Sequence, residues 1–342
     1  MRIIVDDKIP FIRPALAILA SEVRYLPGAS ITADDVRDAD VLIVRTRTRC
    51  DRRLLQGSSV RFIATATIGY DHLDTAYLRE AGITWVNAPG CNAASVGQYV
   101  RSCLLLLARD RGLDLTHTTV GLVGVGHVGQ AVCKALAPMG VRLLLNDPPR
   151  LQAEGCGAVP FCPLEQLQEE ADILSFHTPL VRDGEWPTFH LADRAFLHRL
   201  SRRPYLINTS RGEVVDNEAL EEALDEGLLR QAIIDTWEHE PDIRLSLLHK
   251  VYLGTPHIAG YSADGKANAT RMVLEALCKW MGRKMDFQIQ PPSLPDSFRL
   301  SDDPWERALQ LYDPTRDSDD LKREPGLFER LRGEYPLRRE RV

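Results

Sequence analysis

The chain has 342 residues and a formal net charge of −6 at pH 7, and its length favours two domains that can each bury a core. Apolar residues make up 44% and charged residues 26% of the chain, which is typical of a globular protein and excludes a fibrous or wholly disordered one. The mildly acidic balance gives no electrostatic footprint for nucleic acid or an anionic membrane. The longest apolar run, at 103–108, is far shorter than the roughly 20 residues that span a bilayer.

The cysteines and the N-terminus indicate a cytoplasmic protein with reduced thiols. Seven cysteines are scattered along the chain without a Cys-x-x-Cys pair, which argues against a disulfide framework and against a metal site. They lie at positions 50, 91, 103, 133, 156, 162 and 278. Residues 1–6 read as a strand and lack the long apolar segment of a signal peptide.

Short apolar, β-branched runs alternate with segments of helical periodicity along most of the chain. They predict strands at 2–5, 40–44, 60–64, 83–86, 119–123, 141–146, 172–176, 205–208, 232–235 and 251–253. Helical segments between them include 130–139, 165–170 and 218–226. This alternation predicts βαβ units, and hence an α/β fold with two doubly wound, mostly parallel sheets.

Two other segments bear on the domain organisation. Residues 91–110 carry a long helical pattern between the first four predicted strands and the rest, as a helix bridging two domains would. Beyond the prolines at 291, 292 and 295, residues 299–342 contain 10 basic and 11 acidic residues with apolar residues between them. This last segment is either a solvated tail or a small appended module for self-association.

A glycine-rich motif follows the predicted strand at 119–123. Gly124, Gly126 and Gly129 form the pattern Gly-x-Gly-x-x-Gly, which opens a helical run. The first glycine permits a tight turn, the second lets the backbone approach a pyrophosphate, and the third packs the helix on the strand. The N-terminus of that helix offers free N–H groups and the positive end of a dipole.

The next predicted strand bears on which dinucleotide would bind. Asp147 ends that strand, where a carboxylate can accept hydrogen bonds from ribose hydroxyls and would repel the extra phosphate of NADP. Arg150 lies nearby, and its positive charge would instead favour NADP. We predict NAD, with a glycine turn that binds no ligand as the alternative.

Three polar residues follow later predicted strands, at Arg211, Glu240 and His257. Ligands of open α/β sheets bind outside the carboxyl ends of the strands. Hydride transfer at a hydroxy-acid carbon needs a guanidinium for the carboxylate and a histidine that takes the hydroxyl proton. A carboxylate beside the histidine would orient the ring and favour its protonated form. Each residue alone has an ordinary structural explanation, and only their order after the glycine motif indicates chemistry.

This order of motifs resembles the D-2-hydroxyacid dehydrogenase family, and the resemblance covers about residues 1–335. Ala-Pro-Gly-Cys-Asn at 88–92 and His-Ile-Ala-Gly-Tyr at 257–261 resemble the branch that acts on a phosphorylated sugar acid. The resemblance implies NAD-dependent oxidation of 4-phospho-D-erythronate to 3-hydroxy-2-oxo-4-phosphobutanoate, in the biosynthesis of pyridoxal 5′-phosphate (vitamin B6). It also implies a homodimer, with a 2-oxo acid as reoxidant of the cofactor.

The family implies a split substrate domain at 1–92 and 258–287, a Rossmann NAD-binding domain at 93–257, and a shortened C-terminal dimerisation module at 288–342. His257 would be the acid and base, with Arg211 and Glu240 also catalytic. The implied cofactor-binding residues are Gly124, Gly126, His127, Val128, Gly129, Asp147, Thr178, Thr209, Ser210, Asp235 and Gly260. The implied substrate residues are Thr46, Thr67 and Tyr261.

The run Arg45-Thr-Arg47-Thr-Arg49 adds a candidate for the substrate phosphate. In an extended strand its three arginines would face one side, and Arg45 would form a phosphate subsite; a solvated edge is the alternative.

Two other functions remain open on this evidence. One is another D-2-hydroxyacid dehydrogenase, acting on lactate, glycerate or phosphoglycerate. The other is a non-enzymatic NAD-sensing protein on the same fold.

Overall fold

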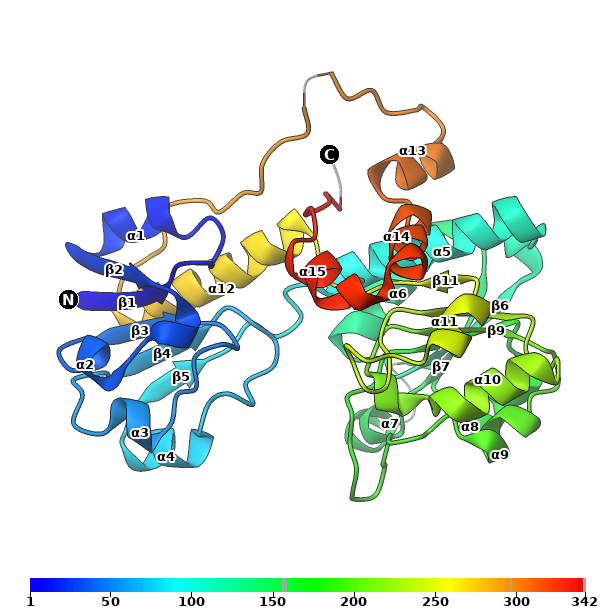
Figure 1. The fold of residues 1–342 in the computed structure, drawn as a ribbon, viewed down its shortest axis with the longest axis horizontal. Helices are drawn as coiled ribbons and strands as arrows, with labels where there is room; N and C mark the ends of the chain where they lie inside the picture. Colours follow the sequence, from blue (N-terminus) through cyan, green and yellow to red (C-terminus); the bar gives the residue numbers. More distant parts are fainter. Residues whose placement is uncertain (156–158, 296, 341–342) are drawn as a thin grey trace. The chain divides into compact units, whose positions relative to one another are not determined.

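The computed structural model describes residues 1–155, 159–295 and 297–340. The chain folds into two compact units (Figure 1): residues 1–92 with 262–294, and residues 93–261 with the segment from 295 onward. Cys156 and the last two residues of the predicted C-terminal module lie outside the described residues. Five of the described cysteines, at positions 50, 103, 133, 162 and 278, are free thiols. In the described ranges, no helix has both the length and the apolar character that crossing a membrane requires.

The first unit is built on a five-stranded parallel sheet with the order β2-β1-β3-β4-β5. Its strands are β1 Arg2–Asp6, β2 Glu22–Leu26, β3 Val41–Val44, β4 Phe62–Thr65 and β5 Thr84–Val86. Its helices are α1 Arg13–Leu19, α2 Ala33–Val36, α3 Arg52–Leu55, α4 Thr75–Glu80 and α12 Ala263–Trp280. Alternate residues of each strand face opposite sides of the sheet. Ile3 and Ile43 therefore share a core with α1 and α12, whereas Ile4 and Leu42 share one with α2, α3 and α4.

The second unit has a six-stranded parallel sheet with the order β11-β10-β9-β8-β6-β7. Its strands are β6 Thr119–Val123, β7 Arg142–Asn146, β8 Ile173–Phe176, β9 Tyr205–Asn208, β10 Gln231–Ile234 and β11 Leu253–Gly254. The strand order reverses on the two sides of β6. The carboxyl ends of β6 and β8 therefore form a switch point, which is where doubly wound sheets bind ligands.

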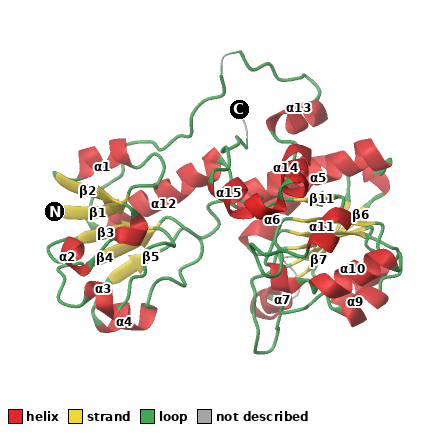
Figure 2. Cartoon of the chain, in the orientation of Figure 1, coloured by secondary structure: helices red, strands yellow, loops and turns green. Residues whose placement is uncertain are grey.

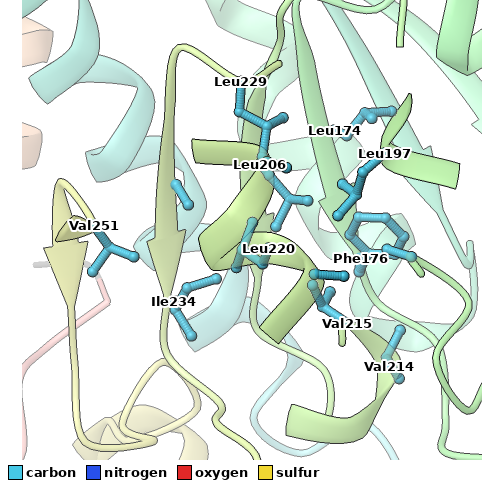
Figure 3. Close-up of a cluster of buried hydrophobic side chains, with 14 of the residues drawn as sticks. Leu174, Phe176, Leu197, Leu206, Val214, Val215, Leu220, Leu229, Ile234 and Val251 are labelled. Carbon is cyan, nitrogen blue, oxygen red and sulfur yellow. The ribbon is translucent and has the colours of Figure 1, made fainter. Parts of the chain in front are cut away.

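Helices cover both faces of this second sheet (Figure 2). The helices of this unit are α5 Ala93–Arg111, α6 His127–Leu136, α7 Pro148–Glu154, α8 Leu164–Glu170, α9 Arg194–His198, α10 Asn217–Asp225, α11 Leu245–Lys250, α13 Pro304–Leu311, α14 Thr315–Arg323 and α15 Phe328–Gly333. One core joins Ile207 and Ile233 to α5 and α6. The other joins Leu206 and Ile234 to α9, α10 and α11 (Figure 3).

Short 3₁₀ turns connect several of these elements: η1 Gly28–Ser30, η2 Leu115–His117, η3 Ala137–Met139, η4 Gly212–Val214 and η5 Pro325–Leu327. The long predicted helix corresponds to α5. Gly97 within it allows close packing, because a Cβ there would lie 2.9 Å from the carbonyl oxygen of Ala131 in α6.

The apolar runs predicted every described strand except β2. Its sequence, Glu-Val-Arg-Tyr-Leu, lies at the edge of the first sheet and none of its residues is buried. An exposed edge strand that carries charges has no clear apolar run, so the signal used for the other strands is missing.

The C-terminal segment packs on the second unit, so a solvated tail is the wrong interpretation of it. Tyr312 lies in the same core as α5. Leu321 and Phe328 are 0% and 1% exposed in the core on the other face of the sheet. The Ser318 Oγ accepts a hydrogen bond from the N–H of Gly254 in β11 (3.0 Å). The self-association expected of this segment stays a prediction.

Candidate active site

The glycine loop lies at the switch point, directly after β6. Gly124 has φ +88°, and a Cβ there would lie 2.9 Å from the carbonyl group of His177. A Cβ at Gly129 would collide with the carbonyl oxygen of Gly124, so only glycine fits both positions. Gly126, the N-cap of α6, has open space where a side chain would begin. The loop therefore forms a tight turn with an uncovered helix N-terminus, as a bound pyrophosphate requires.

Asp147 closes the other side of this loop. Its Oδ2 accepts a hydrogen bond from the Val125 N–H (2.7 Å), and its Oδ1 caps α7 through the Arg150 N–H (3.1 Å). The guanidinium of Arg150 pairs with both carboxylate oxygens of Glu154, at 2.7 and 2.9 Å. Glu154 thus holds the Arg150 guanidinium, and the carboxylate of Asp147 beside the loop favours NAD over NADP.

The segment after β8 offers a second point of attachment for a cofactor. The Thr178 Oγ1 is buried and has no hydrogen-bond partner among the described residues. A buried hydroxyl without a partner is costly, so this atom fits a bound group beside the glycine loop. His127 and Val128 lie in the first turn of α6, and His127 is exposed.

The turn after β9 is braced by side chains. His177 donates or accepts at both ring nitrogens, towards Ser175 Oγ (2.9 Å) and Thr209 Oγ1 (3.2 Å). Burial lowers the pKa of His177 to about 3, so the ring is neutral. The N–H and Oγ of Ser210 both donate to Asn208 Oδ1, at 3.1 and 2.8 Å. This bracing limits movement of the backbone that leads to Arg211.

Arg211 is exposed, and its Nη1 donates to the carbonyl of Ser210 (2.7 Å). Among the residues that the structure describes, no carboxylate lies within ion-pair distance of it. The next residue is Gly212, where a Cβ would collide with the carbonyl group of Trp237. The turns after β9 and β10 are therefore in close contact, and the segment after β10 leads directly to Glu240.

His257 and Glu240 form a close pair. The Nδ1 of His257 lies 2.8 Å from Oε2 and 3.1 Å from Oε1 of Glu240. The Trp237 N–H donates to Oε1 at 2.9 Å. Burial acts to raise the pKa of Glu240, but the hydrogen bond and charge of His257, the Trp237 N–H and the charge of Arg332 together outweigh it, and the pKa lies below its usual value. In the described part of the chain nothing hydrogen-bonds Nε2 of His257, so this nitrogen is available to a substrate.

The turn that carries His257 is held by Asp235. His257 has φ +56°, a left-handed conformation that is costly for a residue with a Cβ. The carboxylate of Asp235 accepts hydrogen bonds from Thr255 Oγ1 (2.6 Å), the Ile258 N–H (2.7 Å) and the Ala259 N–H (3.0 Å). Asp235 is 1% exposed, so the structure places it as a support for the turn that carries His257. Its contact with NAD stays a prediction, as does that of Gly260 in the same turn.

The predicted substrate residues are divided between the two units, with Tyr261 in the second. In the first unit, Arg45 makes a bidentate ion pair with buried Asp6, at 3.1 and 3.2 Å. Thr46 is exposed in the following turn, and the Thr67 Oγ1 donates to the Gly69 carbonyl (2.8 Å).

The expectation that Arg45, Arg47 and Arg49 share one face of a strand is wrong. Strand β3 ends at Val44, and the chain turns with a hydrogen bond from the Thr48 N–H to the Arg45 carbonyl (3.3 Å). Arg49 instead lies 3.2 Å from Asp51.

Sequence reasoning missed two residues that hold the turn of His257. Trp237 donates its indole N–H to the Thr255 carbonyl (2.9 Å). Arg338 donates to the carbonyls of Ile258 (3.0 Å) and Ala259 (2.6 Å). Contacts to backbone carbonyls leave no spacing pattern, so no sequence signal could have found them.

One cluster has the composition of a metal site, namely His190, Asp216 and Glu238. His190 Nε2 lies 2.7 Å from Glu238 Oε1, and Asp216 caps α10. Glu238 also accepts a hydrogen bond from the Asn217 N–H (2.9 Å). These interactions account for the cluster, and we assign it no ion.

Comparison with known proteins agrees with this geometry. The family model described as "D-isomer specific 2-hydroxyacid dehydrogenase, NAD binding domain" matches residues 98–259. A Bacteroides fragilis protein named erythronate-4-phosphate dehydrogenase is 57% identical over 341 residues, which cover 99% of this chain and 97% of that protein. A Pseudomonas fluorescens protein of the same name is 43% identical over 357 residues and covers 99% of this chain and 93% of that protein.

The fold is also found among solved structures. The D-lactate dehydrogenase of Aquifex aeolicus, complexed with NAD and lactic acid, superposes with a TM-score of 0.63 at 23% identity, covering 82% of this chain and 96% of that one. The chain therefore belongs to the D-isomer specific 2-hydroxyacid dehydrogenase family and is an NAD-dependent oxidoreductase. Within that family, it is similar over almost its whole length to the proteins named erythronate-4-phosphate dehydrogenase.

Proposed function

We propose that this chain oxidises the C2 hydroxyl of 4-phospho-D-erythronate to give 3-hydroxy-2-oxo-4-phosphobutanoate, a step in pyridoxal 5′-phosphate biosynthesis. The observation that carries the proposal is the His257–Glu240 pair, which lies in the same unit as the glycine loop. The substrate is supported by the name of the relatives at 57% and 43% identity.

The residues that would hold NAD fit that cofactor. The N–H groups at the start of α6 would face the pyrophosphate, Asp147 the ribose hydroxyls, and Thr178 Oγ1 would gain the hydrogen bond that it lacks. When bound, NAD supplies the acceptor for the hydride from C2.

The protein side chains would accept the proton and stabilise the charges of the reaction. Nε2 of His257 takes the proton of the C2 hydroxyl while the hydrogen on C2 leaves as a hydride, with both electrons of the C2–H bond. Glu240, on the opposite nitrogen, stabilises the imidazolium that forms. The guanidinium of Arg211 offers a planar pair of donors to the substrate carboxylate.

Arg45 would bind the phosphate of the substrate, and Thr46, Thr67 and Tyr261 would contact the substrate. Arg45 is 30% exposed and is fixed by a buried partner, Asp6, which holds its guanidinium in a defined position. A guanidinium that is held in a fixed position can donate hydrogen bonds to the oxygens of a phosphate group.

Three further features belong to the same proposal. A homodimer is supported by large apolar side chains exposed on the C-terminal segment, namely Phe298, Trp305 and Leu337. Free thiols at five of the described cysteines support a cytoplasmic location. Reoxidation of the cofactor by a 2-oxo acid rests on the family resemblance.

A substrate panel tests the proposal. Purified protein is assayed with 4-phospho-D-erythronate, unphosphorylated erythronate and 3-phosphoglycerate, each with and without a 2-oxo acid. We expect preferential oxidation of 4-phospho-D-erythronate. If 3-phosphoglycerate is oxidised faster, the proposed substrate is wrong. If NAD binds but none of the three compounds is oxidised, the result favours an NAD-sensing protein.

A further inference from the structure

The C-terminal helix α15 places a cation on the catalytic pair. The Nη1 of Arg332 lies 3.5 Å from Oε2 of Glu240, the oxygen closest to His257. The guanidinium also hydrogen-bonds the side chain of Tyr261. Arg332 and Glu240 are 29% and 16% exposed at their side chains, so their interaction is partly shielded from solvent.

The position of Arg332 is set by its neighbours in the same segment. Phe328, one turn earlier, is 1% exposed in the core of the second unit. Arg338, which follows the helix, is buried and donates to the Ile258 and Ala259 carbonyls of the turn that carries His257. Its guanidinium also stacks on Tyr312 at 3.8 Å from the ring centre. The segment is therefore anchored on both sides of Arg332.

We propose that Arg332 is a positioning residue for the catalytic pair: its guanidinium holds the Glu240 carboxylate directed at Nδ1 of His257. This inference rests on the proposed function, since it assigns Arg332 a role through Glu240. It gives the C-terminal segment a part in catalysis within its own subunit, in addition to any part in self-association.

The charges around the pair set the direction of the expected effect. Glu240 interacts with His257, Arg332 and the Trp237 N–H, and the charge of Asp235 also interacts with that of His257. Burial would lower the pKa of Arg332, but Tyr261, Glu240 and Glu329 raise it, so the guanidinium stays charged. Burial raises the pKa of the Glu240 carboxyl and the positive charge of Arg332 lowers it. Removing that charge should therefore raise the pKa of Glu240.

The test compares Arg332→Gln, Arg332→Lys and a control on the same helix, Arg330→Gln. Arg330 lies 3.9 Å from Glu334 and is 65% exposed, so its loss removes a charge without touching the site. For Arg332→Gln we expect roughly a fivefold fall in kcat and little change in substrate KM. The acidic limb of the activity profile should move up by about 0.5 pH unit. Arg332→Lys should restore most of this shift, and Arg330→Gln should resemble the wild type.

A second readout does not require turnover. The Glu240 carboxyl is titrated by carbon-13 NMR, with its signal assigned by its loss in Glu240→Gln, and its pKa should rise in Arg332→Gln. An unchanged titration and an unmoved acidic limb would overturn the proposal. A raised KM with unchanged kcat would also overturn it, because Arg332 would then bind substrate directly. A wild-type protein that is inactive on 4-phospho-D-erythronate would contradict the proposed function, while the titration would still decide the role of Arg332.

Discussion

Hydrogen bonds from neighbouring groups fix the positions of His257 and Glu240 in this site. His257 sits in a left-handed backbone conformation that Asp235 supports through two N–H groups of the following residues. Glu240 is fixed by the Trp237 N–H as well as by the ring that it orients. The positions of His257 and Glu240 therefore each depend on a neighbour in the adjacent turn.

Replacing Glu240 by Gln should move the pH profile of activity to lower pH. The lowered pKa of Glu240 reflects an interaction with His257, and this interaction favours the charged forms of both groups. A neutral amide keeps the shape of the side chain but removes the negative charge beside Nδ1 of His257 that would stabilise an imidazolium. Reduction at neutral pH should suffer more than oxidation. Profiles measured in both directions check this, and an unmoved profile would contradict the pairing.

Replacing Asp147 by Ser should relax the preference for NAD. Serine can still cap α7, so the helix is kept while the carboxylate that would repel the 2′-phosphate of NADP is lost. We expect the ratio of kcat/KM for NAD over NADP to fall by at least about tenfold, or about 1.4 kcal/mol. Glu154→Gln, which only frees Arg150, serves as a comparison. An unchanged ratio in Asp147→Ser would exclude Asp147 as the residue that selects the cofactor.

The secondary-structure elements place the site through the order of their strands. Because β9, β10 and β11 are neighbours in the sheet, the turns that carry Arg211, Glu240 and His257 follow its adjacent carboxyl ends. The glycine loop follows β6, on the other side of β8.

Two glycines of the loop give a matched pair of variants. Gly126→Ala adds a methyl group to open space, so the free energy of unfolding should change by less than about 0.5 kcal/mol while KM for NAD rises. Gly129→Ala forces a collision with the Gly124 carbonyl and should cost about 1–3 kcal/mol of stability. Denaturant unfolding and cofactor titration separate the two effects. If Gly126→Ala binds NAD as tightly as the wild type, the pyrophosphate does not lie against that residue.

The sequence predicted those features that depend on local pattern. Apolar runs located the strands, and the spacing of Gly124, Gly126 and Gly129 located the loop. The roles of Asp235, Arg332 and Arg338 could not be predicted, because they follow from burial and from contacts between distant segments. At Arg47 a local pattern was misleading: the alternation of arginine and threonine at 45–49 suggests a strand, but the chain turns there.

Over the whole molecule, the stability should depend on pH through His177. Its pKa of about 3 in the folded protein lies below the value of about 6.5 in an unfolded chain. Between these values only the unfolded state binds the proton, so stability is lost as the pH falls, by up to about 1.4 kcal/mol per pH unit. His177→Asn should flatten the dependence of unfolding free energy on pH between 6.5 and 4, as measured by urea denaturation. An equally steep dependence in the variant would show that other groups cause it.

The most direct test of the whole account is the rate of NADH formation from 4-phospho-D-erythronate by the wild type and by His257→Asn. Asparagine tolerates the left-handed backbone at this position, and NAD affinity measured in parallel reports on the integrity of the cofactor site. We predict rapid NADH formation by the wild type and a loss of about 10²–10⁴-fold in the variant. A variant that retains the wild-type rate would contradict the assignment of His257 as the base, and with it the proposed mechanism.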